Sequence, residues 1–309
     1  MKTVSKFDLE IKNLSKTYIN SKSQKIEALK NISFKVKKGS MLALLGPNGA
    51  GKSTLINILA GIVNKSSGTA IINGFNIEKE IREAKQSIGV VPQELVMDPY
   101  FTPKETLDFQ AGYYGVKKTE KKTYELLKKM KLEDKAEAYV RYLSGGMKRR
   151  LMIAKAMVHS PQVLILDEPT AGVDVSLRQL LWKNIRELNA KGITILITTH
   201  YLEEAESICD DVAIINKGEI VLNGNIKALV KKIDKKKLII YSENLKKNPE
   251  NLKRLGFTIK NQKELHIDYN PSKHSVGYLI NEVIKSKLDI KDVSIKEAKL
   301  EDLFKNIVY

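Results

Sequence analysis

The sequence has little of what secreted or membrane-spanning chains depend on. It holds one cysteine, Cys209, in 309 residues, so no internal disulfide is possible, which suits a reducing compartment such as the cytoplasm. A membrane-spanning helix needs about 18 consecutive apolar residues, and the best runs, Met41–Leu45 and Ile193–Ile197, are far shorter. No apolar stretch follows Met1, so we expect no signal peptide. We therefore expect a chain that does not cross a membrane by itself.

Acidic residues are also few relative to basic ones. The chain has 36 Asp and Glu against 53 Lys and Arg, which gives a net charge of +17. Such an excess fits nucleic acid, an anionic membrane surface or acidic ligands. It also fits lysines that are simply spread over a solvated surface. Because no basic patch is interleaved with aromatic residues, we expect no specific nucleic acid partner.

Apolar strands that alternate with helices indicate a parallel α/β core. Apolar residues make up 42% of the chain, which is ordinary for a soluble protein with a sizeable core. The segments 163–166 and 193–197 read as apolar strands, the second with Thr194 as its one polar residue, and helices such as Leu177–Ala190 separate them. Period-two alternation at 7–11 and 32–36 predicts further short strands. A hairpin is expected at 212–222, turning at Lys217 and Gly218.

Two other regions differ from this core in residue pattern and composition. From about residue 104 to 139 the pattern is helical and charged, which predicts a helical insertion. Its expected inward positions are Leu107, Leu126, Leu127, Met130 and Leu132. After about Asn225 the chain becomes lysine-rich, with expected strands at 238–241 and 265–267 and a helix at 276–285. We predict one domain over residues 1–224 and a small α+β accessory domain over residues 225–309.

A glycine-rich loop between an apolar strand and a helix predicts a phosphate site. The loop fits the pattern G-x-x-x-x-G-K-[ST] and comprises Gly46, Pro47, Asn48, Gly49, Ala50, Gly51, Lys52, Ser53 and Thr54. Its amides can point at phosphate oxygens, and the helix directs its positive end at the same place. Lys52 can reach the β- and γ-phosphates, Ser53 can bind Mg²⁺, and Thr54 can hold the α-phosphate side. We therefore expect ATP and Mg²⁺ as ligands.

Two acids and a histidine stand where two buried strands end. Asp167 closes the strand at 163–166 and suits the water shell of Mg²⁺. Side chains alternate along a strand, so Glu168 should face elsewhere and be available to orient or deprotonate the attacking water. His200 follows the next strand, at the carboxyl edge where ligands bind in such sheets. It can touch the γ-phosphate or the water there.

A second glycine-rich loop precedes the helix expected at 147–158. It contains Ser144, Gly145 and Gly146. Ser144 can cap the helix, and bare glycines let an anion approach the exposed amides. No lysine completes a second phosphate cradle here, and a simple helix-start loop is the alternative interpretation.

Together these motifs resemble the nucleotide-binding subunit of ATP-binding cassette (ABC) transporters over about residues 7–224. The loop at 46–54 matches Walker A, and residues 163–168 match Walker B. Residues 143–147 resemble the LSGGQ signature, although Met147 replaces its usual glutamine. The remaining matches are Gln93 to the Q-loop glutamine, Asp174 to the D-loop aspartate, His200 to the switch histidine and Tyr18 to the aromatic that stacks on adenine.

The resemblance implies a P-loop NTPase fold of the α/β class. Its parts are a RecA-like parallel sheet core, an antiparallel β subdomain, an α-helical subdomain at about 94–160 and the small α+β C-terminal domain. It implies that Gln93 senses Mg²⁺ and the water. It also implies a head-to-tail homodimer, in which ATP on the Walker A loop of one copy is covered by Ser144 and Gly146 of the other. Asp174 would help to couple the two sites.

Softer similarities point to a subgroup. Three segments resemble the ATPases of ABC-2-type exporters, namely residues 143–151, 168–174 and 299–304. This implies a permease on a separate chain, a coupling helix received near residues 99–101, and a peripheral location on the cytoplasmic side of the plasma membrane, where the positive charge would suit anionic lipid headgroups. One alternative is a soluble ABC ATPase of translation or DNA repair, which usually carries two cassettes or a long coiled coil. Another is a transporter whose C-terminal module binds substrate, or one that serves metal or haem-protein maturation.

Overall fold

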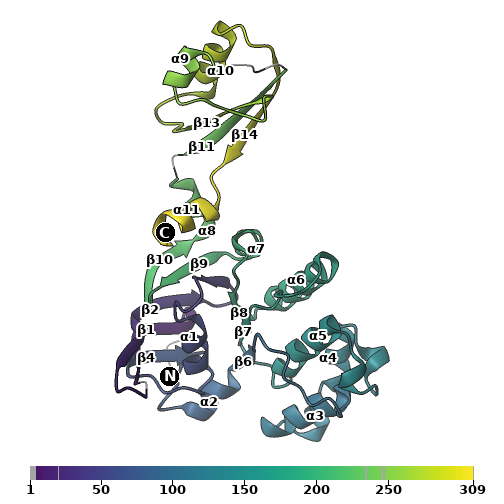
Figure 1. The fold of residues 1–309 in the computed structure, drawn as a ribbon. Coiled ribbons are helices and arrows are strands. Elements are labelled where there is room, and N and C mark those ends of the chain that lie inside the picture. The colour runs from purple at the N-terminus through teal and green to yellow at the C-terminus, as the bar shows by residue number, and fades with distance from the viewer. Residues whose placement is uncertain (1–4, 20, 234, 244, 246–247, 309) are drawn as a thin grey trace. The chain divides into compact units, whose positions relative to one another are not determined.

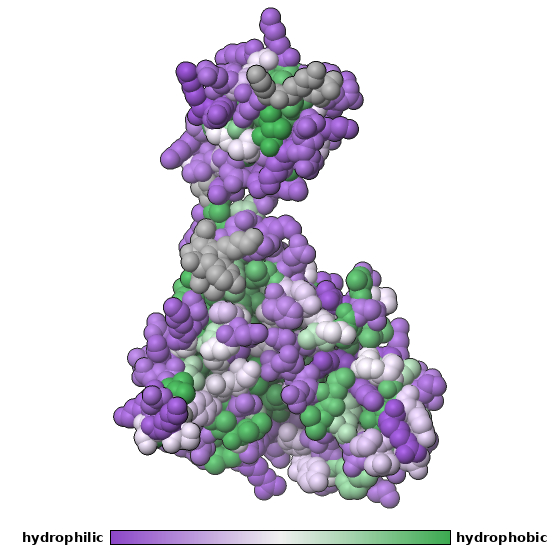
Figure 2. Space-filling view, viewed as in Figure 1, coloured by the Kyte–Doolittle hydropathy of each residue, from purple (hydrophilic) through white to green (hydrophobic). Residues whose placement is uncertain are grey.

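The computed structural model describes residues 5–19, 21–233, 235–243, 245 and 248–308. These residues form two compact units, and the chain passes from the first to the second between Asn225 and Ile226 (Figure 1). Within the described ranges, every helix is too short or too polar to span a lipid bilayer. In the view of Figure 2 the surface of each unit is mainly hydrophilic and is interrupted by hydrophobic patches.

The first unit begins with an antiparallel sheet in the order β2-β1-β4-β5. Its strands are β1 (Phe7–Ile19), β2 (Lys25–Lys37), β4 (Ser67–Ile72) and β5 (Phe75–Asn76). The two alternating segments predicted here are strands, but each strand is 13 residues long and extends well beyond the predicted span. Irregular register shifts between β1 and β2 explain this, because they break the simple alternation on which the prediction relied.

A six-stranded sheet in the order β10-β9-β3-β8-β7-β6 forms the centre of the first unit. Pairing is parallel from β9 across to β6, and only the β9–β10 pair is antiparallel. Every residue of β3 and β8 is buried, which fits the wholly apolar sequence of β3 and includes the two threonines that begin and end β8. The strands are β3 (Met41–Leu45), β6 (Ile88–Val91), β7 (Val163–Asp167), β8 (Thr194–Thr198), β9 (Asp211–Asn216) and β10 (Glu219–Asn225).

The predicted hairpin between β9 and β10 is confirmed. Lys217 and Gly218 both have positive φ, at 47° and 82°. Two successive residues of this kind form the tight turn whose twist matches the flanking strands.

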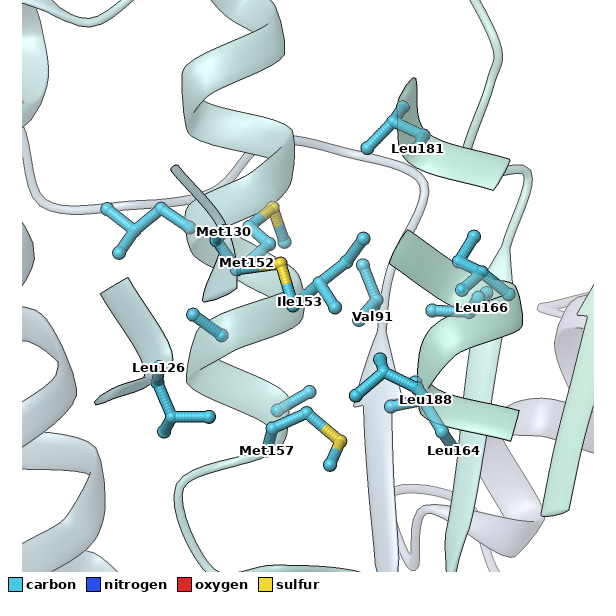
Figure 3. Close-up of a cluster of buried hydrophobic side chains, with 14 of the residues drawn as sticks. Val91, Leu126, Met130, Met152, Ile153, Met157, Leu164, Leu166, Leu181 and Leu188 are labelled. Carbon is cyan, nitrogen blue, oxygen red and sulfur yellow. The ribbon is translucent and has the colours of Figure 1, made fainter. Parts of the chain in front are cut away.

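Helices and two hydrophobic cores complete the first unit. The helices are α1 (Lys52–Leu59), α2 (Ile81–Gln86), α3 (Pro103–Tyr113), α4 (Thr123–Lys129), α5 (Gly145–Ala156), α6 (Val175–Ala190) and α7 (Leu202–Ile208), with short 3₁₀ turns η1 (Lys118–Glu120), η2 (Glu133–Lys135) and η3 (Val140–Tyr142). One core joins the antiparallel sheet, α1 and the central strands. The other packs α4, α5 and α6 against β6 and β7, as Figure 3 shows. All five predicted inward positions of the helical insertion are buried.

The second unit has a ferredoxin-like split βαβ topology. Its sheet has the order β12-β13-β11-β14, all pairs being antiparallel, and the element sequence is β-α-β-β-α-β. The elements are β11 (Lys236–Ser242), α9 (Glu250–Arg254), β12 (Thr258–Lys260), β13 (Glu264–Tyr269), α10 (Val276–Lys285) and β14 (Ile290–Glu297), flanked by α8 (Ile226–Lys231) and α11 (Leu300–Val308). One face of the sheet and the two helices enclose a core around Phe257.

Candidate functional site

The glycine loop connects β3 to α1, and its conformation requires residues without side chains at several positions. Gly49 and Gly51 have φ of 78° and 112°, in the left-handed region that favours glycine. A Cβ atom on Gly46 would lie 2.2 Å from the carbonyl oxygen of Ile215, and one on Gly51 would lie 2.6 Å from that of Ala28. The loop is therefore confined between β9 and β2, and its shape is fixed from both sides.

Lys52, the first residue of α1, lies within this loop. Its side chain is buried, and its Nζ donates hydrogen bonds to the carbonyl oxygens of Gly46 at 2.7 Å and Pro47 at 3.1 Å. Burial lowers the pKa of the Lys52 ammonium, while the charges of Glu168 and Asp167 oppose this change. The result is a partly desolvated cation at the base of a glycine cradle, a setting in which an anionic phosphate is bound more strongly than in water.

A single threonine of β8 fixes the two acids at the end of β7. The Thr198 hydroxyl donates to Oδ1 of Asp167 at 2.5 Å, and it accepts from the backbone N–H of Glu168 at 2.9 Å. Burial is the largest influence on Asp167 and raises its pKa. The charge of Glu168 acts in the same direction, and the hydrogen bond from Thr198 opposes both.

Asp167 and Glu168 line one pocket but have different partners, because Asp167 accepts from Thr198 whereas the Glu168 carboxylate contacts Gln93 and His200. β7 ends at Asp167, and Glu168 adopts a left-handed φ of 46°, so the alternation of a strand does not by itself set the direction of the Glu168 side chain. Such a backbone conformation is unfavourable for a residue other than glycine and is often found at functional sites.

Gln93 and His200 converge on the same oxygen of Glu168. The Gln93 amide donates from Nε2 to Oε2 at 3.2 Å, and Nδ1 of His200 lies 3.4 Å from that oxygen. Gln93 follows β6 and His200 follows β8, on either side of β7. Three adjacent parallel strands thus bring three polar side chains together at their carboxyl ends.

Arg149 is a supporting residue that the sequence reasoning missed. It lies on α5, is 4% exposed, and donates from Nη1 to the carbonyl oxygens of Pro92 at 3.1 Å and Gln93 at 2.8 Å. Burial lowers the pKa of its guanidinium. The arginine therefore holds the loop that carries Gln93 against the helical region. In the sequence, Arg149 is one of several basic residues in a helix, and no pattern distinguishes it from the others.

These side chains surround a pocket of about 610 Å³. Most of the site residues predicted from the sequence line it: Asn48, Gly49, Gly51, Lys52, Ser53, Thr54, Gln93, Asp167, Glu168 and His200. Ala28 of β2 lines it as well, and a lone alanine in a strand gave no signal in the sequence. Gly46, Pro47 and Ala50 belong to the same loop but are not among the lining residues.

The remaining predicted site residues lie outside the lining of this pocket. Tyr18 of β1 is 37% exposed, with Nζ of Lys16 4.8 Å from the centre of its ring. Ser144 caps α5 by accepting from the N–H of Met147 at 3.3 Å. Asp174 caps α6 by accepting from the N–H of Leu177 at 2.9 Å, and this hydrogen bond lowers the pKa of its carboxyl group.

The two glycines of the second loop differ in their surroundings. A Cβ atom on Gly146 would lie 1.9 Å from the side chain of Leu177, so this glycine allows α5 and α6 to pack closely. No atom lies within 4 Å of a Cβ placed on Gly145. Within one chain, packing therefore explains Gly146 but leaves Gly145 without a structural reason.

The donor set of the pocket fits Mg²⁺ bound together with phosphate. Ser53, Gln93 and Asp167 offer a hydroxyl, an amide oxygen and a carboxylate on the same pocket. Among the described residues, no group of three or more His, Cys, Asp or Glu side chains forms a metal site of its own. Mg²⁺ is commonly held by one or two carboxylates together with substrate phosphates. The chain therefore offers the protein ligands that such a site needs, and the phosphates would supply the others.

The parallel sheet, the glycine cradle around Lys52 and the acids at the end of β7 define a P-loop nucleotide-binding protein. Residues 29–171 match the family model described as ABC transporter. The chain is 35% identical, over 308 residues and 97% of both chains, to the linearmycin resistance ATP-binding protein LnrL of Bacillus subtilis. It is 43% identical to the Nod factor export ATP-binding protein I of Burkholderia orbicola over 224 residues, 72% of both chains.

Solved structures agree with this assignment. An ATP-binding subunit of an ABC transporter superposes with a TM-score of 0.64 at 32% identity, over 72% of this chain and 92% of that one. The ATP-binding cassette MJ0796, in a dimeric post-hydrolysis state with ADP and Pi, superposes with a TM-score of 0.63 at 26% identity. The match covers 70% of this chain and 98% of that one. The chain belongs to the ATP-binding subunits of ABC transporters and is an ATPase. Membership implies a membrane partner and a peripheral association with the membrane.

Proposed function

We propose that this chain powers an ABC-2-type exporter by binding and hydrolysing ATP while a separate permease carries the cargo. The observation that carries the proposal is the convergence of Gln93 and His200 on one carboxylate oxygen of Glu168, beside the cradle of Lys52. The export role is supported by similarity along nearly the whole chain to a resistance protein, and along the first unit to Nod factor export proteins.

The residues of the pocket divide the chemistry among them. Lys52 and the loop amides bind the β- and γ-phosphates, and Ser53 with Asp167 would hold Mg²⁺, which would neutralise phosphate charge there. Glu168 accepts a proton from the attacking water. Gln93 and His200 keep the Glu168 carboxylate oriented, because both contact its Oε2 atom.

We further propose that two copies complete each other's sites on the cytoplasmic side of the plasma membrane. Ser144, Gly145 and Gly146 do not line the pocket of their own chain. The open space at Gly145 supports a role on a second copy, where a bare backbone could approach the phosphates bound in the partner's loop. A head-to-tail pair with a two-fold axis places two such loops over two cradles. Asp174, at the start of α6, then couples the two sites.

The permease is proposed to dock beside α3. A depression of about 210 Å³ there is bordered by Met97, Phe101, Phe109, Tyr113 and Lys155 among others. The rings of Phe101 and Phe109 stack with their centres 5.0 Å apart, and Phe109 is 55% exposed. Exposed aromatic residues of this kind are common anchors at protein interfaces, so they suit a short helix of the membrane partner.

Co-expression with a membrane protein of the ABC-2 permease class from the same genome tests the export proposal. The chain should sediment with membranes only when that protein is present, and Phe109→Asp should release it. The exposed Tyr278→Asp of the second unit is the control. Membrane binding that does not depend on the permease, or that survives Phe109→Asp, contradicts the proposed docking.

A further inference from the structure

Glu204 is a buried carboxylate that the mechanism above leaves unused. It lies in the first turn of α7 and is only 7% exposed. The Thr170 hydroxyl is 2.9 Å from both of its oxygens, and the Thr199 hydroxyl donates to Oε2 at 2.9 Å. Nε of Arg178 lies 3.4 Å from Oε1. A buried charge is costly unless it is paired and hydrogen-bonded, and Glu204 has partners from three different segments.

Each of these partners belongs to a segment that carries a group of the site. Thr170 follows Glu168 by two residues, and Thr199 immediately precedes His200. Both threonines are almost fully buried, at 1% and 3% exposure. Glu204 therefore joins the loop of the proposed base to the loop of the histidine without reaching the pocket itself, since it is not among the lining residues.

A second chain of contacts runs from Glu204 to the histidine ring. The guanidinium of Arg178 lies over the ring of Tyr201 at 4.6 Å, and the centre of that ring is 4.0 Å from the ring of His200. The N–H of Tyr201 donates to the Thr199 hydroxyl at 3.0 Å. Arg178 belongs to α6, the helix that Asp174 caps. The same carboxylate thus also ties α6 to the histidine loop.

We propose that Glu204 is a positioning residue that sets the distance between Glu168 and His200. This rests on the proposed roles of those two residues. Glu168 has an unfavourable left-handed backbone, so its neighbours must hold it there. Thr198 holds its N–H, and the contact of Thr170 with Glu204 holds the residues that follow. Loss of the Glu204 charge loosens the residues after Glu168 and the loop of His200, and Glu168 is then held only by Thr198 at its N–H and by Gln93 at its carboxylate.

The first test is Glu204→Gln in the full-length chain, with the exposed Glu203→Gln on the same helix as the matched control. Small misplacements of reacting groups cost on the order of 100-fold in rate. We expect kcat to fall about 10- to 100-fold for Glu204→Gln, with KM for ATP changed less than about threefold, since Lys52 and its loop are untouched. An unchanged kcat, or a loss confined to KM, overturns the proposal.

A second pair of variants keeps the test valid if Glu204→Gln folds poorly. Thr170→Val removes the hydroxyl at nearly constant volume, whereas Thr170→Ser keeps it. Thr170→Val should lower kcat about as much as Glu204→Gln, Thr170→Ser should restore most of it, and the Thr170→Val/Glu204→Gln double variant should be no slower than the worse single one. Additive losses, or equal activity of the Val and Ser variants, contradict a shared positioning network.

Failure of this inference is distinguishable from failure of the proposed function. Glu168→Gln tests the base directly and does not depend on Glu204. If Glu168→Gln abolishes turnover while Glu204→Gln retains full kcat, only the positioning role is wrong. If Glu168→Gln hydrolyses ATP normally, the proposed mechanism itself is wrong.

Discussion

Glu168 concentrates the unusual features of the site in one residue. It has a left-handed backbone, receives a hydrogen bond from Gln93 and lies 3.4 Å from His200. Glu168→Gln should lower kcat by about 10²–10⁴-fold, the usual contribution of a general base, and should leave ATP binding intact. Steady-state hydrolysis and equilibrium ATP binding measure the two effects. Wild-type turnover in this variant would contradict the role given to Glu168.

Lys52 should act on binding rather than on the chemical step. Its ammonium occupies the centre of the loop, held by two carbonyl oxygens. Lys52→Ala removes a charge-assisted contact of about 1.5–3 kcal/mol, which corresponds to about a 10- to 100-fold weaker Kd for ATP. Calorimetric titration with ATP checks this value. The control is Lys183→Ala, at an exposed position on α6, and an equal loss of affinity in both variants would count against a specific role for Lys52.

At the scale of elements, a glycine in β6 allows α5 to pack on the sheet. A Cβ atom on Gly89 would lie 2.4 Å from the carbonyl oxygen of Ala156, at the end of α5. Gly89→Ala should therefore destabilise the chain by about 1–3 kcal/mol, the usual cost of overpacking. The control Gly112→Ala on α3 meets no atom within 4 Å and should be neutral or stabilising by up to about 1 kcal/mol. Denaturant unfolding measures the free energy of unfolding of both variants. Equal values for Gly89→Ala and Gly112→Ala would contradict the proposed close packing at Gly89.

The sequence predicted elements best where the residue pattern is uniform. The apolar strands β7 and β8 and the helix α10 were predicted close to their observed limits. The edge strand β14 was missed because its sequence, IKDVSIKE, has little apolar content and most of its residues are exposed or half-buried. The opposite edge strand β12 and the helix α9 were not predicted either, so the ferredoxin-like topology could not be deduced from the sequence.

The site was predictable to the extent that its residues lie in local motifs. The glycine loop and the acids after β7 are contiguous in the sequence, so residue spacing alone identified them. Arg149, Ala28 and Glu204 act through contacts between distant segments, and no local pattern marks them. The direction of Glu168 also required the structure, since its left-handed φ is set by the strand end and by Thr198.

At the scale of the whole molecule, the proposed site requires a second copy of the chain. The pocket of one chain holds the cradle, the acids and the histidine, but it lacks the loop at 144–146. Gly145 offers a way to disable that loop without disturbing its own chain, because a Cβ atom there meets nothing within 4 Å. An aspartate at this position also suits the start of α5, where negative charge is favourable. Its charge would, however, face the phosphates bound by the partner.

The most direct measurement mixes two variants that should be nearly inactive on their own, Glu168→Gln and Gly145→Asp, and follows ATP hydrolysis at saturating ATP. In a head-to-tail pair, a mixed dimer has one site in which both defects meet and one site that is fully intact. Mixing in equal amounts should therefore restore about a quarter of the wild-type rate if pairing is random and the sites are independent. If hydrolysis does not recover on mixing, or if Gly145→Asp alone is fully active, the shared site does not exist as described.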